Sequence, residues 1–373
     1  MRVLHLFANH KFTGPADPAL VLAAAQSDLG AEVTFASSTP RIGKSDLQKQ
    51  VSARGLESLE GLRLPKHSKG LATITDVTRL RRTLKSDRFD VVHCHLANDH
   101  LTATIATRGL EIPVVRSLYH LEPPCGRRAR HSLGRSSLVL APSAEAARLL
   151  GESGLIDEER IEVVPPVLDL ERFNHRSSSE IREAWGCAGE DVVIGVVARM
   201  QPHRLFDLLI EGFNMAAREF PQIRLVILGR GTHQEEVAFK PARRSEFSQR
   251  IIFPGYIDPR EYPRHLASFD LLIYLVPGSD GTCRAAREAL ASGVPVISTA
   301  RGLLGELMPE GPGGARIATE EARSLADRLV ELASSTESRQ AHSRAAREFA
   351  RLKFDPQRAA REVLEGYRAF SHL

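Results

Sequence analysis

Two carboxylates stand at places in the sequence where they could bind a polar ligand. Asp280 and Glu288 lie eight positions apart, the first in a loop and the second on a helix predicted over 284–291. Apolar runs flank this stretch, at 271–276 and 294–298, and predict a strand–loop–helix–strand unit. In such a unit the loop lies at the carboxyl edge of a parallel sheet, where ligands bind. The free N–H groups at the start of the helix suit an anion.

Two arginines follow another predicted strand. Arg199 and Arg204 come after the apolar segment 192–197. A guanidinium can bind phosphate oxygens in a bidentate fashion, whereas an ammonium acts as a point charge. Because the carboxyl ends of parallel strands share one edge of the sheet, the pair predicts a phosphate site there. The alternative is that both arginines are solvated surface cations.

The elements that would position these residues alternate along the chain. Apolar segments typical of buried strands are separated by helical segments, which indicates an α/β fold with doubly wound parallel sheets. Pro165 and Pro166 interrupt the alternation, and a polar linker follows over 169–179. The chain has 373 residues, which suits two domains. Strands are expected at 3–8, 32–36, 90–94, 114–117, 138–141 and 161–164, then at 192–197, 224–228, 251–253, 271–276 and 294–298.

The bulk composition is that of a globular protein. Charged residues make up 26% and hydrophobic residues 42% of the chain. The four cysteines are scattered, without a C-x-x-C pair, which fits a reducing cytoplasm rather than a disulfide framework. No apolar run approaches the length of a membrane span, and the first residues predict a strand rather than a signal peptide.

The stretch around the two carboxylates resembles the donor-binding segment of family 4 glycosyltransferases, which are retaining enzymes of the GT-B fold. Their signature is Glu-x7-Glu followed by Ala-Met-Ala-x-Gly-x-Pro-Val. Here Glu288 is followed by Ala-Leu-Ala-Ser-Gly-Val-Pro-Val over 289–296. Two positions depart from the pattern: Asp280 replaces the first Glu, and Thr282-Cys283 replaces a Phe-Gly pair.

The resemblance covers essentially the whole chain. Arg199 falls on the family's phosphate-binding Arg, Arg204 falls on its Lys, and Leu205 replaces the Gly that follows. Pro165 and Asp169 match the interdomain segment. The resemblance implies a GT-B protein with Rossmann-like domains at 1–170 (acceptor) and 171–353 (donor), and a helix over 354–373 that packs back on the first domain.

The resemblance also implies roles for individual residues. Glu288 would bind the ribose hydroxyls and Asp280 the transferred sugar, while Arg199 and Arg204 would stabilise the departing diphosphate. His120, after the strand at 114–117, would face the transferred sugar. Further donor contacts would come from glycines near phosphate, a base-binding loop, the start of the helix and a later carboxylate: Gly14, Gly229, Gly231, Tyr256, Ile257, Gly281, Thr282, Cys283 and Glu306.

A metal is not expected at this site. No Asp-x-Asp motif follows a strand. His93 and His95 end another predicted strand, and we expect them to point to opposite faces and to hold no ion. The interpretation is a transferase that needs no cofactor beyond its substrate, a nucleotide-diphospho-sugar with UDP or GDP.

The expected function is the retaining transfer of a hexosyl unit to a glycan, a lipid-linked saccharide or a small molecule. Two alternatives stay open: a sugar-nucleotide epimerase or phosphorylase of the same fold, and a non-catalytic nucleotide-sugar-binding subunit.

Charge is uneven along the chain and bears on its partners. Residues 63–135 hold 14 Lys and Arg against 6 Asp and Glu, a balance of +8, whereas the net charge of the chain is +4. This segment favours a cytoplasmic protein with peripheral contact to an anionic membrane, and no nucleic-acid partner is expected. The apolar group that would enter the interface is Leu118, Tyr119, Leu121, Pro123 and Pro124. The alternative is that the basic residues are dispersed over solvated faces.

Overall fold

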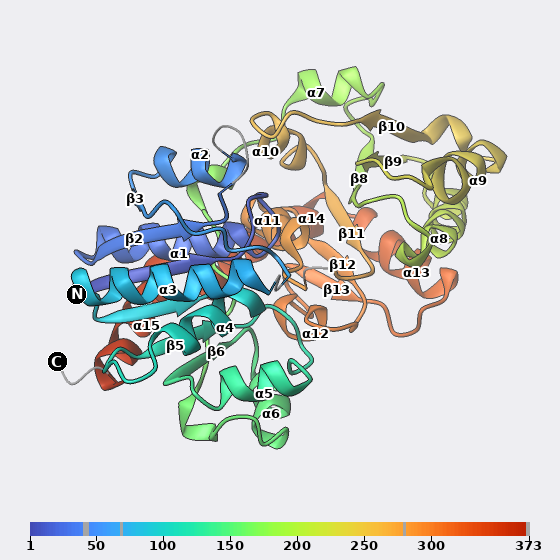
Figure 1. Ribbon diagram of the computed structural model, residues 1–373. Coiled ribbons are helices and arrows are strands. Elements are labelled where there is room, and N and C mark those ends of the chain that lie inside the picture. The colour runs from blue at the N-terminus through green and yellow to red at the C-terminus, as the bar shows by residue number, and fades with distance from the viewer. Residues whose placement is uncertain (40–44, 68–69, 279–280, 371–373) are drawn as a thin grey trace. The chain divides into compact units, whose positions relative to one another are not determined.

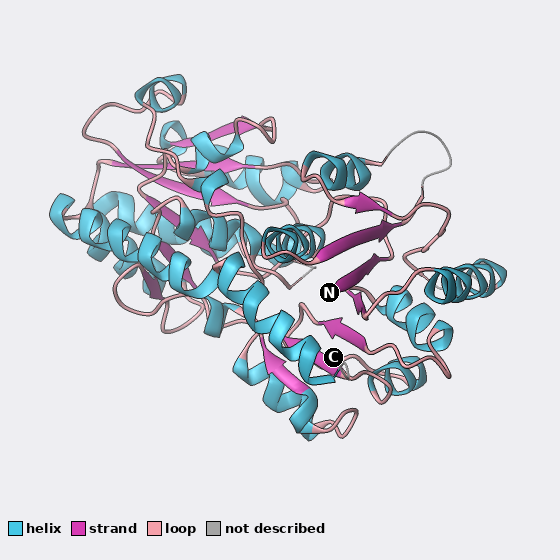
Figure 2. Cartoon of the chain, turned by 90° about the vertical axis from the view of Figure 1, so that its left-hand side faces the viewer, coloured by secondary structure: helices cyan, strands magenta, loops and turns pink. Residues whose placement is uncertain are grey.

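The computed structural model describes residues 1–39, 45–67, 70–278 and 281–370. The chain forms two compact units (Figure 1). The first is built from Met1–Leu168, Asp280–Thr282 and Phe354–Leu373, and the second from Asp169–Ser279 and Cys283–Lys353. Each unit contains one parallel sheet with helices on both faces (Figure 2). The fold is therefore α/β with two Rossmann-like units, as the sequence predicts.

The sheet of the first unit has the strand order β3-β2-β1-β4-β5-β6-β7. The order reverses between β1 and β4, which makes that place the topological switch point. Side chains of β1 alternate between two apolar clusters, one on each face of the sheet. The strands are β1 (Arg2–Phe7), β2 (Glu32–Ser37), β3 (Glu57–Ser58), β4 (Val91–Cys94), β5 (Val114–Ser117), β6 (Leu138–Ala141) and β7 (Ile161–Val163).

The helices of the first unit cover both faces of its sheet. One cluster includes residues of α1, α2 and α15, and the other includes residues of α3 and α4. The helices are α1 (Ala16–Asp28), α2 (Asp46–Ala53), α3 (Leu71–Ser86), α4 (Ala97–Ala106), α5 (Arg127–Leu133), α6 (Ala144–Glu152) and α15 (Pro356–Phe370).

The last helix, α15, belongs to the first unit although it ends the chain. It lies against α1 (blue and red in Figure 1) and buries an apolar stripe that includes Val363 and Leu364. Gln26 on α1 donates a hydrogen bond to the hydroxyl of Tyr367 at 3.1 Å. Both residues are fully buried, so this helix completes the core of the first unit.

The sheet of the second unit has the order β10-β9-β8-β11-β12-β13 and reverses between β8 and β11. Its central strands are almost wholly apolar, as expected for strands that are covered on both faces. The strands are β8 (Val192–Val197), β9 (Ile223–Leu228), β10 (Ile251–Gly255), β11 (Leu271–Tyr274), β12 (Val296–Ser298) and β13 (Gly314–Arg316). The helices are α7 (Ser179–Ala184), α8 (Phe206–Glu219), α9 (Lys240–Arg244), α10 (Tyr262–Leu266), α11 (Arg284–Ala291), α12 (Leu304–Leu307), α13 (Ala322–Ala333) and α14 (Thr336–Phe354).

One expected helix has a different form. The sequence predicts a single helix over 234–243, but the structure has a wide turn at Glu235–Phe239 with π-type hydrogen bonding, followed by the short α9. Pro241 explains the change, because it has no N–H to donate to the carbonyl one turn earlier. In the part of the chain that the structure describes, no helix is both long enough and apolar enough to cross a membrane.

Candidate nucleotide-sugar site

The switch point of the second unit carries the two predicted arginines. Arg199 lies in the loop that leaves β8, and its side chain is exposed. Arg204 ends a short 3-10 turn, Pro202–Arg204, just before α8. Because β8 and β11 are neighbours at the reversal of strand order, both arginines lie at the edge where open α/β sheets bind ligands.

Arg204 is held by the neighbouring loop. One of its terminal nitrogens donates to the carbonyl oxygens of Val276 at 2.7 Å and Pro277 at 3.0 Å. Its Nε is buried and meets no acceptor among the described residues. The guanidinium therefore braces the loop after β11, with further N–H donors beyond those two bonds.

Leu205 has the backbone conformation that glycine prefers. Its φ of 58° and ψ of 38° lie in the left-handed region, directly before the first residue of α8. A side chain costs roughly 1–2 kcal/mol in this conformation. This geometry gives a physical reason why the resembling family has Gly at the position where this chain has Leu205.

Two glycines press the loop after β9 against the loop after β8. A Cβ on Gly229 would collide with the carbonyl oxygen of Ala198, and a Cβ on Gly231 would collide with that of Met200. Gly229 also has a φ of +133°, which side chains rarely adopt. The two backbones can lie in contact around Arg199 only because these positions carry no side chain.

The predicted base-binding loop follows β10. Tyr256 is 62% exposed, and its ring lies under the guanidinium of Arg230 at 4.8 Å. Ile257, next to it, is half-buried. The loop thus presents an aromatic face and accessible backbone at the same sheet edge.

The start of α11 is the predicted anion-binding helix end. Gly281 has a φ of +71°, and Thr282 is fully buried. Cys283 precedes the helix with a φ of 49° and is also fully buried. A left-handed residue other than glycine is uncommon, so the turn into this helix has a constrained shape. Asp280, the other predicted sugar ligand, lies outside the described residues.

Glu288 is the most enclosed carboxylate of the candidate site. Its side chain is 2% exposed, and each oxygen has a partner. The hydroxyl of Tyr262 donates to Oε2 at 3.0 Å, and Nε of Arg284 donates to Oε1 at 2.8 Å. Burial, and then the nearby carboxylate, raise the pKa of Tyr262 well above its usual range, so this phenol stays a donor.

The sequence predictions missed Tyr262 and Arg284. The spacing of Arg284 was a usable signal, because an Arg and a Glu four positions apart on a helix are neighbours. Tyr262 reaches Glu288 from a different helix, α10, and no local pattern indicated that contact. Glu306, also predicted near the nucleotide, lies on α12 and is half-buried.

In the first unit, the two predicted residues follow strands of its own sheet. Gly14 is buried in the turn between β1 and α1. His120 is exposed, three residues after the end of β5. The structure therefore gathers the arginines, the paired glycines and Tyr256 along one edge of the second sheet, and places Gly14 and His120 beyond strands of the first.

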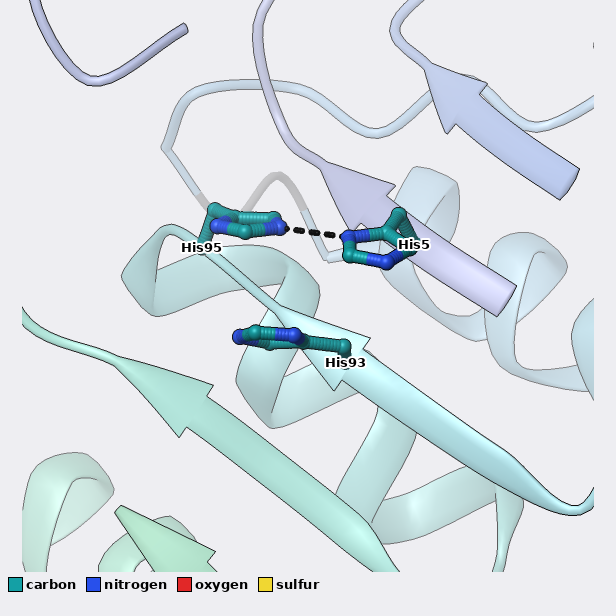
Figure 3. A group of neighbouring side chains, drawn as sticks. All are labelled: His5, His93 and His95. Atoms are coloured by element: carbon teal, nitrogen blue, oxygen red, sulfur yellow. Dashed lines mark hydrogen bonds between the residues drawn. The ribbon is translucent and has the colours of Figure 1, made fainter. Parts of the chain in front are cut away.

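The prediction that His93 and His95 point to opposite faces is wrong. They are two positions apart, so they share one face of the strand. Their rings stack with centroids 4.4 Å apart, and His5 of β1 joins them (Figure 3). In the described ranges, these three form the group of ligand-type side chains that could hold an ion, with nitrogens within 4.8 Å of one another.

The buried charges of the first unit lie near this group. Arg116 and Asp99 approach to 3.5 Å, and Asp99 also accepts from the backbone N–H groups of Ala8 and Leu96. Burial raises the pKa of Asp99 to about 7 despite these partners. Burial lowers the pKa of His5 to about 4, and lowers the pKa values of His93 and His95 well below the usual range.

Sequence comparisons identify the family. A model of the Glycosyltransferase Family 4 matches residues 19–172, and a model of the Glycosyl transferases group 1 matches residues 177–349. The chain belongs to the family 4 glycosyltransferases. Together the two matches extend over both units, and the parallel sheets of seven and six strands are those of the GT-B fold.

The individual proteins to which this chain is similar share about a quarter of its residues or fewer. D-inositol 3-phosphate glycosyltransferase of Nocardia farcinica is 26% identical over 65% of this chain, and the match spans only 58% of that relative's length. The same-named protein of Kribbella flavida is 26% identical over 92% of this chain and 87% of its own. Among solved structures, Anabaena HepE in complex with UDP has a TM-score of 0.80 at 18% identity, with 99% of this chain and 100% of that chain covered. That likeness concerns the fold.

Proposed function

We propose that the protein transfers a hexosyl unit from a nucleotide-diphospho-sugar to an acceptor with retention of the anomeric configuration. The observation that carries this proposal is the composition of one sheet edge. At the β8/β11 switch point, the exposed Arg199 lies between two residues whose carbonyls pack against Gly229 and Gly231, and Arg204 braces the loop after β11. At such an edge a diphosphate can contact positively charged side chains and can approach the backbone closely.

The proposed roles follow from the geometry. Arg199 is free to contact phosphate oxygens, while Arg204 keeps the loop after β11 in place and contributes fixed positive charge. The turns at Gly229 and Gly231 let the donor approach the backbone closely. Glu288 is held in one orientation by Tyr262 and Arg284, which prepares its oxygens for the hydroxyls of a ribose.

The chemistry asked of the protein is mainly electrostatic. As the bond between sugar and diphosphate breaks, negative charge grows on the leaving phosphate, and the arginines and the start of α11 stabilise it. The acceptor oxygen then bonds to the anomeric carbon on the face from which the diphosphate leaves, and a phosphate oxygen of the leaving group takes the proton of the acceptor hydroxyl. We propose that this needs no divalent metal and no cofactor besides the donor.

The identities of the nucleotide and of the acceptor are also proposed. Anabaena HepE has been solved with UDP, with UDP and glucose, and with UDP-glucose, which supports testing uridine nucleotides first and guanosine nucleotides second. The relatives named D-inositol 3-phosphate glycosyltransferase support including that phosphorylated polyol beside glycan and lipid-linked acceptors.

A peripheral membrane contact is part of the proposal, with one correction. Leu118 and Tyr119 are buried, so they cannot enter a lipid interface as the sequence suggested. On α5 and just beyond it, however, the arginines at 127, 128, 130 and 135 are all exposed. We propose cytoplasmic action with loose binding to anionic lipid, at about 1 kcal/mol for each basic residue near the surface. Liposome co-sedimentation at low salt tests it, and equal recovery in the supernatant with neutral and anionic vesicles would refute it.

Nucleotide binding in the presence of EDTA tests the site itself. UDP or GDP should raise the melting temperature of the full chain in excess chelator, because a ligand that binds only the folded state stabilises it. Arg199→Ala should abolish most of this shift. The control is Arg328→Ala, which removes a surface arginine on α13 whose partner is Glu331. An unchanged shift in Arg199→Ala, or a shift that chelator removes, would contradict the proposal.

A further inference from the structure

A continuous chain of hydrogen bonds runs through the core of the first unit. His95 Nδ1 lies 2.8 Å from the hydroxyl of Tyr119, and His95 Nε2 lies 3.0 Å from Nδ1 of His5 (Figure 3). His5 Nε2 lies 2.8 Å from Oε1 of Gln26, whose Nε2 donates to Tyr367. These five side chains are all at most 6% exposed.

The chain continues from Tyr367 back to the strand where it began. The hydroxyl of Tyr367 lies 2.5 Å from Nδ1 of His93, and His93 Nε2 lies 2.8 Å from Oγ of Ser117. Ser117 ends β5 and Tyr119 is two residues further on. The chain of bonds therefore starts at Tyr119 just beyond β5, passes the end of β4 and then β1, α1 and α15, and returns through His93 of β4 to Ser117 of β5.

One arrangement has every hydrogen atom of this chain running in the same direction. A neutral imidazole has one N–H donor and one nitrogen acceptor. Because Oε1 of Gln26 accepts from His5 Nε2, Nδ1 of His5 must accept from His95 Nε2, and Nδ1 of His95 must accept from the Tyr119 hydroxyl. On the other side, Tyr367 accepts from Gln26, and in this arrangement it donates its own proton to Nδ1 of His93, so that His93 donates from Nε2 to Ser117. All three histidines are then Nε2–H tautomers.

Reversing one member would force every other member to reverse. If the Gln26 amide were turned over, His5 would accept at Nε2 and donate from Nδ1, and the same change would pass to His95 and His93. In either of these two arrangements the three rings share one tautomer, and the proposal below predicts that shared state. A protonated ring would have two donors and would break the chain, and the positive charge of Arg116 also disfavours protonation of His93 and His95.

This chain also accounts for the six ring nitrogens without a metal ion. Each nitrogen already lies within hydrogen-bond distance of a partner side chain.

We propose that this chain is a positioning device that fixes the backbone around Tyr119, and hence His120, from the C-terminal helix. Tyr119 and Ser117 are held on either side of Leu118, and both holds depend on Tyr367 and Gln26. Tyr119 is thus a positioning residue, and the effect on turnover rests on the proposed hexosyl transfer and on the role that the family resemblance implies for His120, which is to face the transferred sugar. The tautomers and their coupling do not depend on that function.

Two serines of the first unit provide a matched pair for the test. Ser117 bonds His93 Nε2 at 2.8 Å, and Ser136 bonds Nε2 of His100 at the same distance outside the chain. Both serines are buried, and so are both histidines. Ser117→Ala and Ser136→Ala therefore remove similar contacts, but only the first interrupts the proposed device.

The experiment is ¹⁵N NMR of the full chain with labelled histidine, near pH 7.5. His5, His93 and His95 should show one shared tautomer, Nε2–H. Ser117→Ala should shift the His5 and His95 signals as well as that of His93, whereas Ser136→Ala should shift only that of His100. Different tautomers among the three rings, or an effect of Ser117→Ala confined to His93, would overturn the proposal.

Activity provides the second readout. Ser117→Ala and Tyr119→Phe should lower kcat roughly tenfold with little change in the KM for donor, since displacement of a reacting group costs turnover rather than donor binding. Ser117→Thr, which restores the hydroxyl, should recover both the NMR signals and kcat. Coupled NMR signals with unchanged kcat would overturn the positioning role. If His120→Ala left turnover unchanged, His120 would have no role in transfer. The NMR result on the tautomers would still test the hydrogen-bond chain, because it is measured without substrate.

Discussion

The two units have the same architecture but carry their polar groups in different places. In the second unit the polar groups lie beyond the strand ends, on turns where Gly229 and Gly231 allow backbones to touch. In the first unit they lie on the strands themselves, where His5 and His93 sit opposite each other in neighbouring strands. The turns of the second unit leave charge open to a ligand, whereas the three histidines of the first unit use their ring nitrogens in hydrogen bonds inside the core. A parallel sheet can thus support a binding edge or a buried polar network with the same topology.

The largest effect is expected from filling the close approach in the second unit. Gly229→Ala places a Cβ against the carbonyl of Ala198 at a φ of +133°. We expect a loss of at least about 2 kcal/mol in the free energy of unfolding, together with loss of nucleotide binding. Urea unfolding and calorimetric titration with UDP measure both. Gly189→Ala is the control, because a Cβ there meets nothing within 4 Å; equal stability of the two variants would contradict the packing described.

The next largest effect is expected at Glu288. Glu288→Gln keeps the shape of the side chain but removes its charge and one acceptor, against two donors that are already in place. We expect kcat/KM for the donor to fall by about 10- to 100-fold, equivalent to about 1.4–2.7 kcal/mol. Steady-state kinetics over a range of donor concentrations provide the measurement. A variant with unchanged kcat/KM would remove Glu288 from the donor site.

Acid should destabilise the first unit through its neutral histidines. Their pKa values are lowered in the folded state, to about 4 for His5, whereas an unfolded histidine titrates near 6.5. Between these values the unfolded chain binds more protons, so stability falls as the pH drops from about 6.5 toward 4, by up to about 1.4 kcal/mol per histidine and pH unit. Asp99 acts in the opposite direction, because its pKa is raised to about 7 and the folded state takes up its proton first.

Four histidines of the first unit, His5, His93, His95 and His100, have lowered pKa values, against raised pKa values for the carboxyls of Asp99 and Glu162, so we expect a net loss of stability in acid. Urea unfolding of the full chain at pH 7.5, 6.0 and 5.0, followed by a probe of the first unit, measures it. His5→Gln should flatten this dependence. Stability that stays constant or rises between pH 6.5 and 5 would show that the histidines are not held neutral.

The smallest effect is expected at Leu205. Leu205→Gly relieves a left-handed backbone but frees the unfolded chain and removes a side chain packed on the core of the second unit. These effects oppose each other, so we expect the free energy of unfolding to change by less than about 1 kcal/mol and the KM for the donor to stay the same. Thermal melting and kinetics check this, and a large loss of either would show that the leucine side chain is needed at this turn.

The sequence predicts much of the second unit because its information is local. The helix expected over 284–291 begins and ends at those residues in the structure, and the arginines and glycines follow strands that are continuous apolar runs. Spacing along the chain was enough to place them at one sheet edge. Asp280 could not be compared, since it lies outside the described residues.

The first unit shows where such reasoning fails. Histidine in a strand gives no sign of its partner, and the chain of bonds joins residues up to 341 positions apart, from Gln26 to Tyr367. Tyr262 and Glu288 are a smaller case of the same kind, 26 positions apart on different helices. Contacts of this type depend on how helices pack on a sheet. A single sequence contains no local pattern that predicts this packing. The error about His93 and His95 was different, because the strand period of two already places them on one face.

The most direct test of the proposed transferase is to follow the product by ¹H NMR in excess EDTA. The full chain is incubated with UDP-glucose or other α-linked nucleotide sugars and the acceptor panel, and the anomeric coupling of new signals is recorded. We predict an α-linked product formed in step with the free nucleoside diphosphate, and loss of both in Arg199→Ala. A β-linked product, or activity that appears only when metal is restored, would contradict the mechanism proposed for the second unit.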